Sequence, residues 1–213
     1  MILWLASYPK SGNTWIRAII SSLVYSKDGI FDFQMLKNIS QFPRRSYFKD
    51  FTENYSDLKE ISDYWIQAQK KINSDTKLKI FKTHNGNYNF LGKEFTNKEN
   101  TSGVIYIVRD PRNIITSISN HYQLNLEESY NFLTDEKRFL FNLNDPNDIS
   151  EENIVTLLSS WKTHYNSWKI SSNSIIIKYE DLLLDPMLQI NKLCIYMQNF
   201  FNLLGISFDV LRE

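Results

Sequence analysis

Short apolar runs alternate along this chain with segments whose apolar residues recur at helical spacing. The first run extends from Ile2 to Ser7 and predicts a buried strand. Behind Thr14, apolar residues recur at i, i+3, i+4, i+7 and i+8, which predicts an amphipathic helix. Three further strands are predicted within 77–84, 101–110 and 173–183. Strands separated by helices predict an α/β fold with three layers, in which helices cover both faces of a parallel sheet.

Cap signals add to the helix predictions. Asp110 can cap a helix that begins with Pro111, and Ser150, followed by two glutamates, can cap another. Residues 28–56 show poor periodicity and are expected to be irregular. The predicted helices behind the first occupy about 57–71, 111–122, 150–168 and 186–205. Because no linker or repeat divides the chain, 1–213 is expected to form one domain.

Composition narrows the choice of partners. The 213 residues are 42% hydrophobic and 23% charged, and 24 Lys and Arg balance 24 Asp and Glu. A zero net charge gives no reason to expect nucleic acid or an anionic membrane as partner. The single cysteine, Cys194, allows no internal disulfide and no cysteine-based zinc site. With no signal sequence and no apolar run of about 18 residues, a cytoplasmic protein without a membrane span is expected, and its oligomeric state is not readable.

The stretch YPKSGNTW, residues 8–15, lies between the first strand and its helix. Five consecutive positions there combine a charge, small polar side chains and a glycine: Lys10, Ser11, Gly12, Asn13 and Thr14. A strand, a tight turn and a helix start form a site for an anion such as phosphate. The order of residues differs from the G-x-x-x-x-G-K-[ST] loop that holds nucleotide triphosphates with Mg²⁺. An ordinary strand–helix turn is the alternative interpretation.

Polar residues end two other predicted strands, at Lys82–His84 and at Arg109–Asp110. Ligands of parallel sheets gather at the carboxyl ends of the strands, so these residues and the loop are expected to converge. The imidazole of His84 can accept a proton near neutral pH, and the guanidinium of Arg109 can bind a phosphate through two hydrogen bonds. A structural histidine and a surface ion pair are the alternatives. His121 and His164 fall inside predicted helices, where a structural role is favoured.

Four segments together resemble the cytosolic-type sulfotransferases. YPKSGNTW resembles the loop for the 5′-phosphosulfate, and FKTH resembles the segment with the catalytic histidine. VRDPRNIITSISNHY resembles the 3′-phosphate motif, where a serine follows the arginine by eight positions, and KYEDLLLDP resembles a segment near the adenine. They stand in the family's order and span residues 8–186.

The resemblance implies a P-loop nucleotide-kinase-like fold and 3′-phosphoadenosine 5′-phosphosulfate (PAPS) as the sulfuryl donor, with no metal required. It implies that residues 10–14 hold the 5′-phosphosulfate and that Trp15 stacks on the adenine, with Tyr179 nearby. Arg109 and Ser117 would then hold the 3′-phosphate. The implied catalytic residues are His84 as general base, with Lys10 and Lys82 near the transferred group.

Two departures from the family pattern qualify the implied activity. Asn13 replaces the commoner threonine, although its amide can still donate a hydrogen bond. The given sequence ends at GISFDVLRE without the basic, glycine-containing segment that usually closes over the 3′-phosphate. A short variant, a truncated product, and a protein in which other groups supply those contacts are the three interpretations. A catalytically impaired nucleotide-binding protein and a kinase-type phosphoryl transferase on the same fold are therefore the alternatives. A small-molecule or glycan acceptor is expected. Loop aromatics such as Phe42 and Tyr88 are candidates to line its pocket, and the alternative is that they belong to the core.

Overall fold

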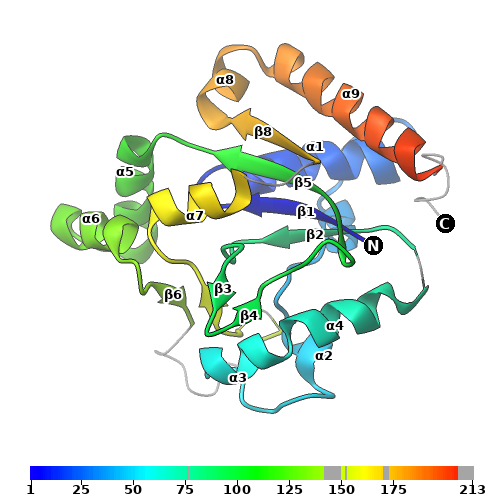
Figure 1. The fold of residues 1–213 in the computed structure, drawn as a ribbon. Coiled ribbons are helices and arrows are strands. Elements are labelled where there is room, and N and C mark those ends of the chain that lie inside the picture. The colour runs from blue at the N-terminus through cyan, green and yellow to red at the C-terminus, as the bar shows by residue number, and fades with distance from the viewer. Residues whose placement is uncertain (76, 142–149, 152, 170–172, 206–213) are drawn as a thin grey trace.

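A parallel four-stranded sheet forms the centre of the computed structural model (Figure 1), which describes residues 1–75, 77–141, 150–151, 153–169 and 173–205. The strand order is β2-β1-β5-β8. These strands are β1 (Ile2–Ser7), β2 (Lys79–Thr83), β5 (Thr101–Val108) and β8 (Ser174–Lys178). In β1, Ala6 lies opposite Thr83 on one side and Tyr106 on the other. The carboxyl ends of β1, β2 and β5 therefore meet at one edge, as the sequence predicts.

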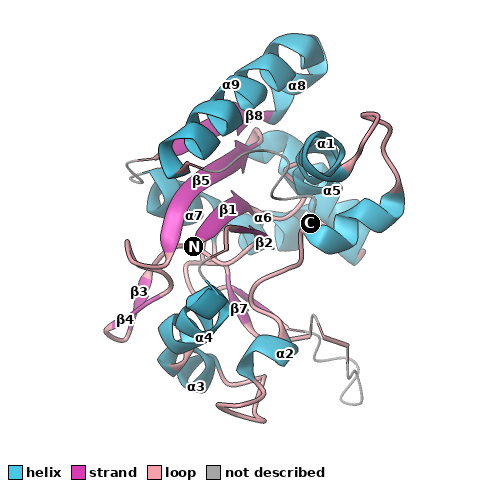
Figure 2. Ribbon diagram, turned by 90° about the vertical axis from the view of Figure 1, so that its right-hand side faces the viewer, coloured by secondary structure: helices cyan, strands magenta, loops and turns pink. Residues whose placement is uncertain are grey.

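Helices cover both faces of this sheet, which confirms the predicted three-layer fold. Leu3 and Leu5 of β1 pack in one core cluster with residues of α1 (Asn13–Tyr25) and α9 (Pro186–Leu204). The alternate residue Trp4 packs on the other face, with Trp65 of α4 (Trp65–Ile72) and Trp168 of α7 (Trp161–Lys169). Figure 2 shows α9 and the α3–α4 pair on opposite sides of the sheet.

The remaining helices and strands lie around these layers. The helical segments are η1 (Phe33–Asn38), α2 (Arg45–Phe48), α3 (Leu58–Asp63), η2 (Asn73–Asp75), α5 (Pro111–Tyr122), α6 (Leu126–Thr134) and α8 (Tyr179–Leu184). The short strands are β3 (Asn89–Phe90), β4 (Lys93–Glu94), β6 (Phe139–Leu140) and β7 (Thr156–Leu157). Within the described residues, no helix is both long enough and apolar enough to cross a membrane.

Three predicted elements differ from the structure. The helix predicted over 57–71 is two helices, because the chain turns at Tyr64 between α3 and α4. The helix predicted from Ser150 begins only at Trp161. Residues 153–160, which precede it, are all buried and include β7. An extended chain can bury eight consecutive residues, whereas a helix at the surface would expose some of them to solvent. Glu152, one of the predicted first-turn acids, lies outside the described residues.

The third difference lies next to the site. The strand predicted over 173–183 stops at Lys178, and Tyr179 begins α8. The ring of Tyr179 thereby packs beside Gly12. The segment 28–56, expected to be irregular, holds only η1 and α2 but contributes Phe42 and Phe48 to the core.

Candidate active site

The loop between β1 and α1 has a backbone shape that few sequences tolerate. Lys10 and Gly12 both have positive φ angles, of 64° and 97°, in the region that favours glycine. A Cβ atom at Gly12 would lie 2.6 Å from Cδ2 of Tyr179, so space also requires glycine. No side chain caps the first turn of α1. Its first N–H groups therefore face outward at the positive end of the helix dipole, where an anion can bind.

The polar side chains of this loop point in two directions. Thr14 and Trp15 are exposed, and the hydroxyl of Ser11 is buried without a hydrogen-bond partner among the described residues. Asn13 turns inward instead, and its Nδ2 donates to Leu5 O at 3.2 Å and to Ser7 Oγ at 3.1 Å. The donor role that the sequence predicts for the Asn13 amide toward a ligand is thus taken by β1.

His84 lies one residue beyond β2 and is held by the end of β1. Its Nδ1 lies 2.7 Å from Ser7 O and 3.3 Å from Ser7 Oγ. Because a carbonyl oxygen only accepts hydrogen bonds, Nδ1 carries the proton, and in the neutral ring Nε2 carries the lone pair. Burial lowers the pKa of His84 to about 4, helped by the charge of Lys82 and opposed by the bond to Ser7. The ring is therefore neutral at pH 7 and presents an unprotonated nitrogen.

Lys82 brings a second positive charge to the same strand end. It lies in β2 opposite Leu5 of β1, two residues before His84. Side chains two apart on a strand share a face, and the positive charge of Lys82 contributes to the lowered pKa of His84. The backbone of Lys82 also bonds to the segment before Pro43: its N–H donates to Ser40 O and its carbonyl accepts from Phe42, both at 2.9 Å.

Arg109 joins the loop to the ends of β5 and β8. Its Nη1 donates to Lys10 O at 2.8 Å, and its guanidinium carbon lies 4.3 Å from the centre of the Tyr179 ring. The Nε of Arg109 is buried and has no hydrogen-bond partner among the described residues. The Tyr179 ring meets the Trp15 ring edge-on, with centroids 6.0 Å apart. Three segments far apart in sequence are thus in direct contact.

Ser117, the predicted partner of Arg109 at the 3′-phosphate, lies in the helix that follows β5. It is half-buried in α5, whose start is capped by Asp110 through the backbone N–H of Arg112 at 2.9 Å. Ser117 lies six residues beyond Pro111, which is about 9 Å along a helix. No hydrogen bond joins Ser117 to Arg109 within the described part of the chain.

Two supporting residues, Ser7 and Glu180, were missed by sequence reasoning, and a third, His164, has the structural role in a helix that the sequence favoured. Ser7 holds the ring of His84, and Glu180 accepts a hydrogen bond of 3.0 Å from the Asp110 N–H, which ties β5 to α8. His164 of α7 donates from Nε2 to His84 O at 3.1 Å, and its Nδ1 meets Tyr106 Oη at 2.9 Å. A serine at the end of an apolar strand was the available signal for Ser7. Nothing local in the sequence signals the other two contacts.

The fold defines a P-loop nucleotide-kinase-like protein, and the cluster at its carboxyl edge combines an uncapped helix start with a neutral histidine. Residues 2–202 match the model of the sulfotransferase domain, and the chain belongs to this family. Among the described residues, no group of three or more His, Cys, Asp and Glu is placed to hold a metal ion.

Known relatives and structures agree with this family. The chain is 22% identical over 197 residues to 3-alpha-hydroxysteroid sulfotransferase of Cavia porcellus, covering 90% of this chain and 56% of the relative. Mouse sulfotransferase SULT7A1 complexed with PAP is similar in structure, with a TM-score of 0.53, 19% identity, and coverage of 97% of this chain and 59% of the other.

Retinol dehydratase in a complex with retinol and PAP gives a TM-score of 0.51 and 16% identity, with coverage of 92% and 59%. The chain therefore spans less than two thirds of the length of each of these proteins. The expected C-terminal departure falls partly after Gly205, outside the described residues.

Proposed function

We propose that this chain is a sulfotransferase that moves a sulfuryl group from PAPS to a hydroxyl or amine, with His84 as the general base. The observation that carries this proposal is the hydrogen bond between His84 Nδ1 and Ser7 O, which leaves Nε2 to accept a proton. A base of this kind contributes about 10²–10⁴-fold to a rate. A cytoplasmic location and a small-molecule or glycan acceptor stay predictions.

The residues of the cluster suit the two ends of the donor. The α1 start, Lys10, Ser11 and Thr14 would bind the 5′-phosphosulfate, and Arg109 with Ser117 would bind the 3′-phosphate. Trp15 and Tyr179 would contact the adenine. Two buried polar groups without a partner among the described residues, Ser11 Oγ and Arg109 Nε, support an anionic ligand here, since such groups normally find one.

The reaction would be an in-line displacement at sulfur. The acceptor oxygen or nitrogen forms a bond to sulfur, the bond between sulfur and the 5′-phosphate oxygen breaks, and the acceptor proton moves to His84 Nε2. Negative charge grows on the departing phosphate, where Lys10 and the helix start would stabilise it. The negative charge of the donor would also raise the low pKa of His84, so the base would strengthen once the donor is bound.

Calorimetry with adenosine 3′,5′-bisphosphate tests the donor site. Arg109→Ala is expected to weaken binding at least about tenfold, because charge-assisted hydrogen bonds are lost. Arg112→Ala is the matched control: it removes an exposed guanidinium three residues away that pairs with Asp110. Equal affinity in wild type and Arg109→Ala, with both folded by circular dichroism, would overturn the 3′-phosphate assignment.

Turnover assays separate the alternatives. A sulfotransferase transfers label from PAPS to an acceptor, whereas a kinase-type enzyme consumes ATP with Mg²⁺. A catalytically impaired protein binds the bisphosphate and transfers nothing to a broad acceptor panel.

A further inference from the structure

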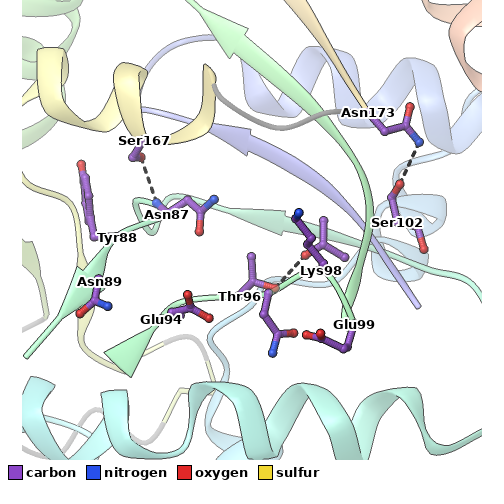
Figure 3. Close-up of a pocket in the computed structure, with 12 residues that line it drawn as sticks. Asn87, Tyr88, Asn89, Glu94, Thr96, Lys98, Glu99, Ser102, Ser167 and Asn173 are labelled. Atoms are coloured by element: carbon purple, nitrogen blue, oxygen red, sulfur yellow. Dashed lines mark hydrogen bonds between the residues drawn. The ribbon is translucent and has the colours of Figure 1, made fainter. Parts of the chain in front are cut away.

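Polar side chains gather at both edges of the sheet. Near the amino ends of β5 and β8, an open cavity of about 920 Å³ includes Ser102 and Asn173 in its lining (Figure 3), and Asn173 donates to the Ser102 carbonyl at 2.8 Å. Lys10, His84 and Arg109 are not among the described residues that line this cavity. The loop between β1 and α1, residues 8–12, lies at the opposite edge of the sheet, and we call it the donor loop.

The donor loop holds a lysine in a conformation that lysine disfavours. The φ angle is 64° at Lys10 and 97° at Gly12, and Ser11 between them has no positive φ. Glycine adopts a positive φ freely, whereas the Cβ atom of lysine crowds the backbone there, so other contacts must hold the residue. A turn of this kind directs successive backbone N–H groups toward one concave side, which binds anions. The anion site therefore depends on the contacts that hold Lys10.

Arg109 supplies such a contact to the peptide group that follows Lys10. Its Nη1 donates to Lys10 O at 2.8 Å, and a hydrogen bond from a charged donor is stronger than one between neutral groups. Because a peptide group is planar and trans, the N–H of Ser11 points away from the carbonyl that Arg109 holds. The single bond from Arg109 therefore fixes the direction of both the carbonyl and the N–H.

The start of α8 in turn holds Arg109. The guanidinium carbon lies 4.3 Å from the centre of the Tyr179 ring, and the next residue, Glu180, accepts a hydrogen bond of 3.0 Å from the Asp110 N–H. The Tyr179 ring also occupies the space beside Gly12. Protein contacts alone therefore position the guanidinium, and the donor loop is held at residues 10 and 12 from the same side.

Building on the proposed function, we infer that Arg109 is a positioning residue for the 5′ end of the donor, in addition to its proposed contact with the 3′-phosphate. By holding the carbonyl of Lys10, Arg109 keeps the donor loop in the shape that binds a 5′-phosphate. The loop is preformed, so it binds a nucleotide that carries only a 5′-phosphate. Removal of Arg109 weakens the binding of that nucleotide as well.

Two isomeric nucleotides separate the two roles of Arg109. Adenosine 5′-monophosphate carries only the 5′-phosphate, and adenosine 3′-monophosphate carries only the 3′-phosphate. Calorimetry with each of them, and with the bisphosphate, compares wild type with Arg109→Ala. Arg112→Ala is the matched control, because it removes an exposed guanidinium that pairs with Asp110. Circular dichroism checks that each variant is folded.

Arg109→Ala is expected to weaken both monophosphates about tenfold or more, and Arg112→Ala should change neither by more than about threefold. A loss for the 3′-monophosphate alone would overturn the inference and leave the proposed function standing. A loss for the 5′-monophosphate alone would support the inference and contradict the 3′-phosphate assignment. A wild type that binds the bisphosphate but not the 5′-monophosphate would overturn the preformed loop. A wild type that binds none of the three nucleotides would contradict the proposed function.

A double-mutant cycle tests whether Arg109 acts through Lys10. Because glycine adopts a positive φ without a holding contact, Lys10→Gly should make the donor loop less dependent on Arg109. In the Lys10→Gly background, the tenfold loss of 5′-monophosphate affinity on Arg109→Ala should shrink to about threefold or less. The free energy of unfolding of the same four proteins, measured by urea denaturation, should show coupling in the same direction. Additive effects in both measurements would show that Arg109 acts by its charge alone and would overturn the inference.

Discussion

His84 and His164 are both buried histidines, and a hydrogen bond to the His84 carbonyl joins them, but only His84 keeps a ring nitrogen without a protein partner among the described residues. His84 and His164 both have a pKa lowered mainly by burial, to about 4 and about 3. Each donates one ring N–H to a backbone carbonyl. In His164 the second nitrogen, Nδ1, accepts from the Tyr106 hydroxyl, so neither ring nitrogen is available to accept a proton. In His84 the second nitrogen has no protein partner among the described residues.

This difference shows that a depressed pKa alone does not mark a base. Burial depresses any histidine, and structural hydrogen bonds then use both nitrogens. The feature that distinguishes His84 is the unshared Nε2, combined with its position at the edge where Lys10 and Arg109 also lie. The fully bonded ring of His164 in turn fixes the chain that carries His84.

The largest effect is expected on removing the unshared nitrogen. His84→Asn keeps an N–H close to Ser7 O but has no group in the place of Nε2, and His84→Ala removes both. Both variants should lower kcat by about 10²–10⁴-fold or more, because proton acceptance is lost. Affinity for adenosine 3′,5′-bisphosphate, measured by calorimetry, should stay within about threefold of wild type, since a His84 bond contributes little to the bisphosphate. Normal turnover in His84→Asn would refute the base assignment.

The next largest effect is expected on the free energy of unfolding when His164 is replaced. His164→Gln can retain the donor to the His84 carbonyl but leaves the Tyr106 hydroxyl without its acceptor. A buried unsatisfied group costs about 1–3 kcal/mol of unfolding free energy, measured by urea denaturation. His164→Gln/Tyr106→Phe should recover part of it, because both partners of the lost bond are then gone. A fall in kcat for His164→Gln as deep as that for His84→Asn, in protein shown to be folded, would remove the contrast between the rings.

The pH dependence of stability follows from the same burial. The unfolded histidines titrate near 6.5, whereas the folded ones titrate near 4 and 3. Their contribution to the free energy of unfolding is therefore complete above about pH 6.5 and is lost as the pH falls toward the folded values. His164→Gln should make the loss between pH 6.5 and 4 less steep in the same urea experiment, and an unchanged slope would contradict the low pKa of His164.

The sheet, the loop and the residues at the strand ends could be read from the sequence because each depends on local pattern. An apolar run followed by Lys10 and Gly12 specifies a strand and a turn, and Pro111 specifies a helix start. The error at 150–168 arose because eight buried residues in a row carry no periodicity to separate helix from strand. Ser7 was missed, and the particular partners of His164 were not predicted, since the contacts of these residues with His84 span 77 and 80 residues, and such contacts are set by packing alone.

A smaller effect on rate is expected from Ser7→Ala. The Ser7 carbonyl still accepts from His84, but the hydroxyl that bridges Asn13 to the ring is lost. The ring should be less well oriented, so kcat should fall about two- to tenfold with KM for PAPS unchanged. Ser21→Ala is the matched control, because Ser21 is a fully buried serine of α1 whose hydroxyl has no partner in the described structure. An equal loss in Ser21→Ala would show that packing, not ring orientation, is responsible.

The smallest effect is a change in the titration of His84, and it tests the comparison most directly. NMR of the ring Cε1–H, assigned with the His84→Asn and His164→Gln variants, should give His84 a pKa of about 4 in the free protein. Adding the bisphosphate should raise that pKa, because negative charge nearby favours the imidazolium. The pKa of His164 should change little, because His164 contacts the backbone of residue 84 and not its ring. The acid limb of kcat/KM reports the free enzyme and should therefore fall tenfold per pH unit below about pH 4, with kcat falling at a higher pH. If His164 responded to the bisphosphate and His84 did not, the catalytic and structural assignments of the two rings would have to be exchanged.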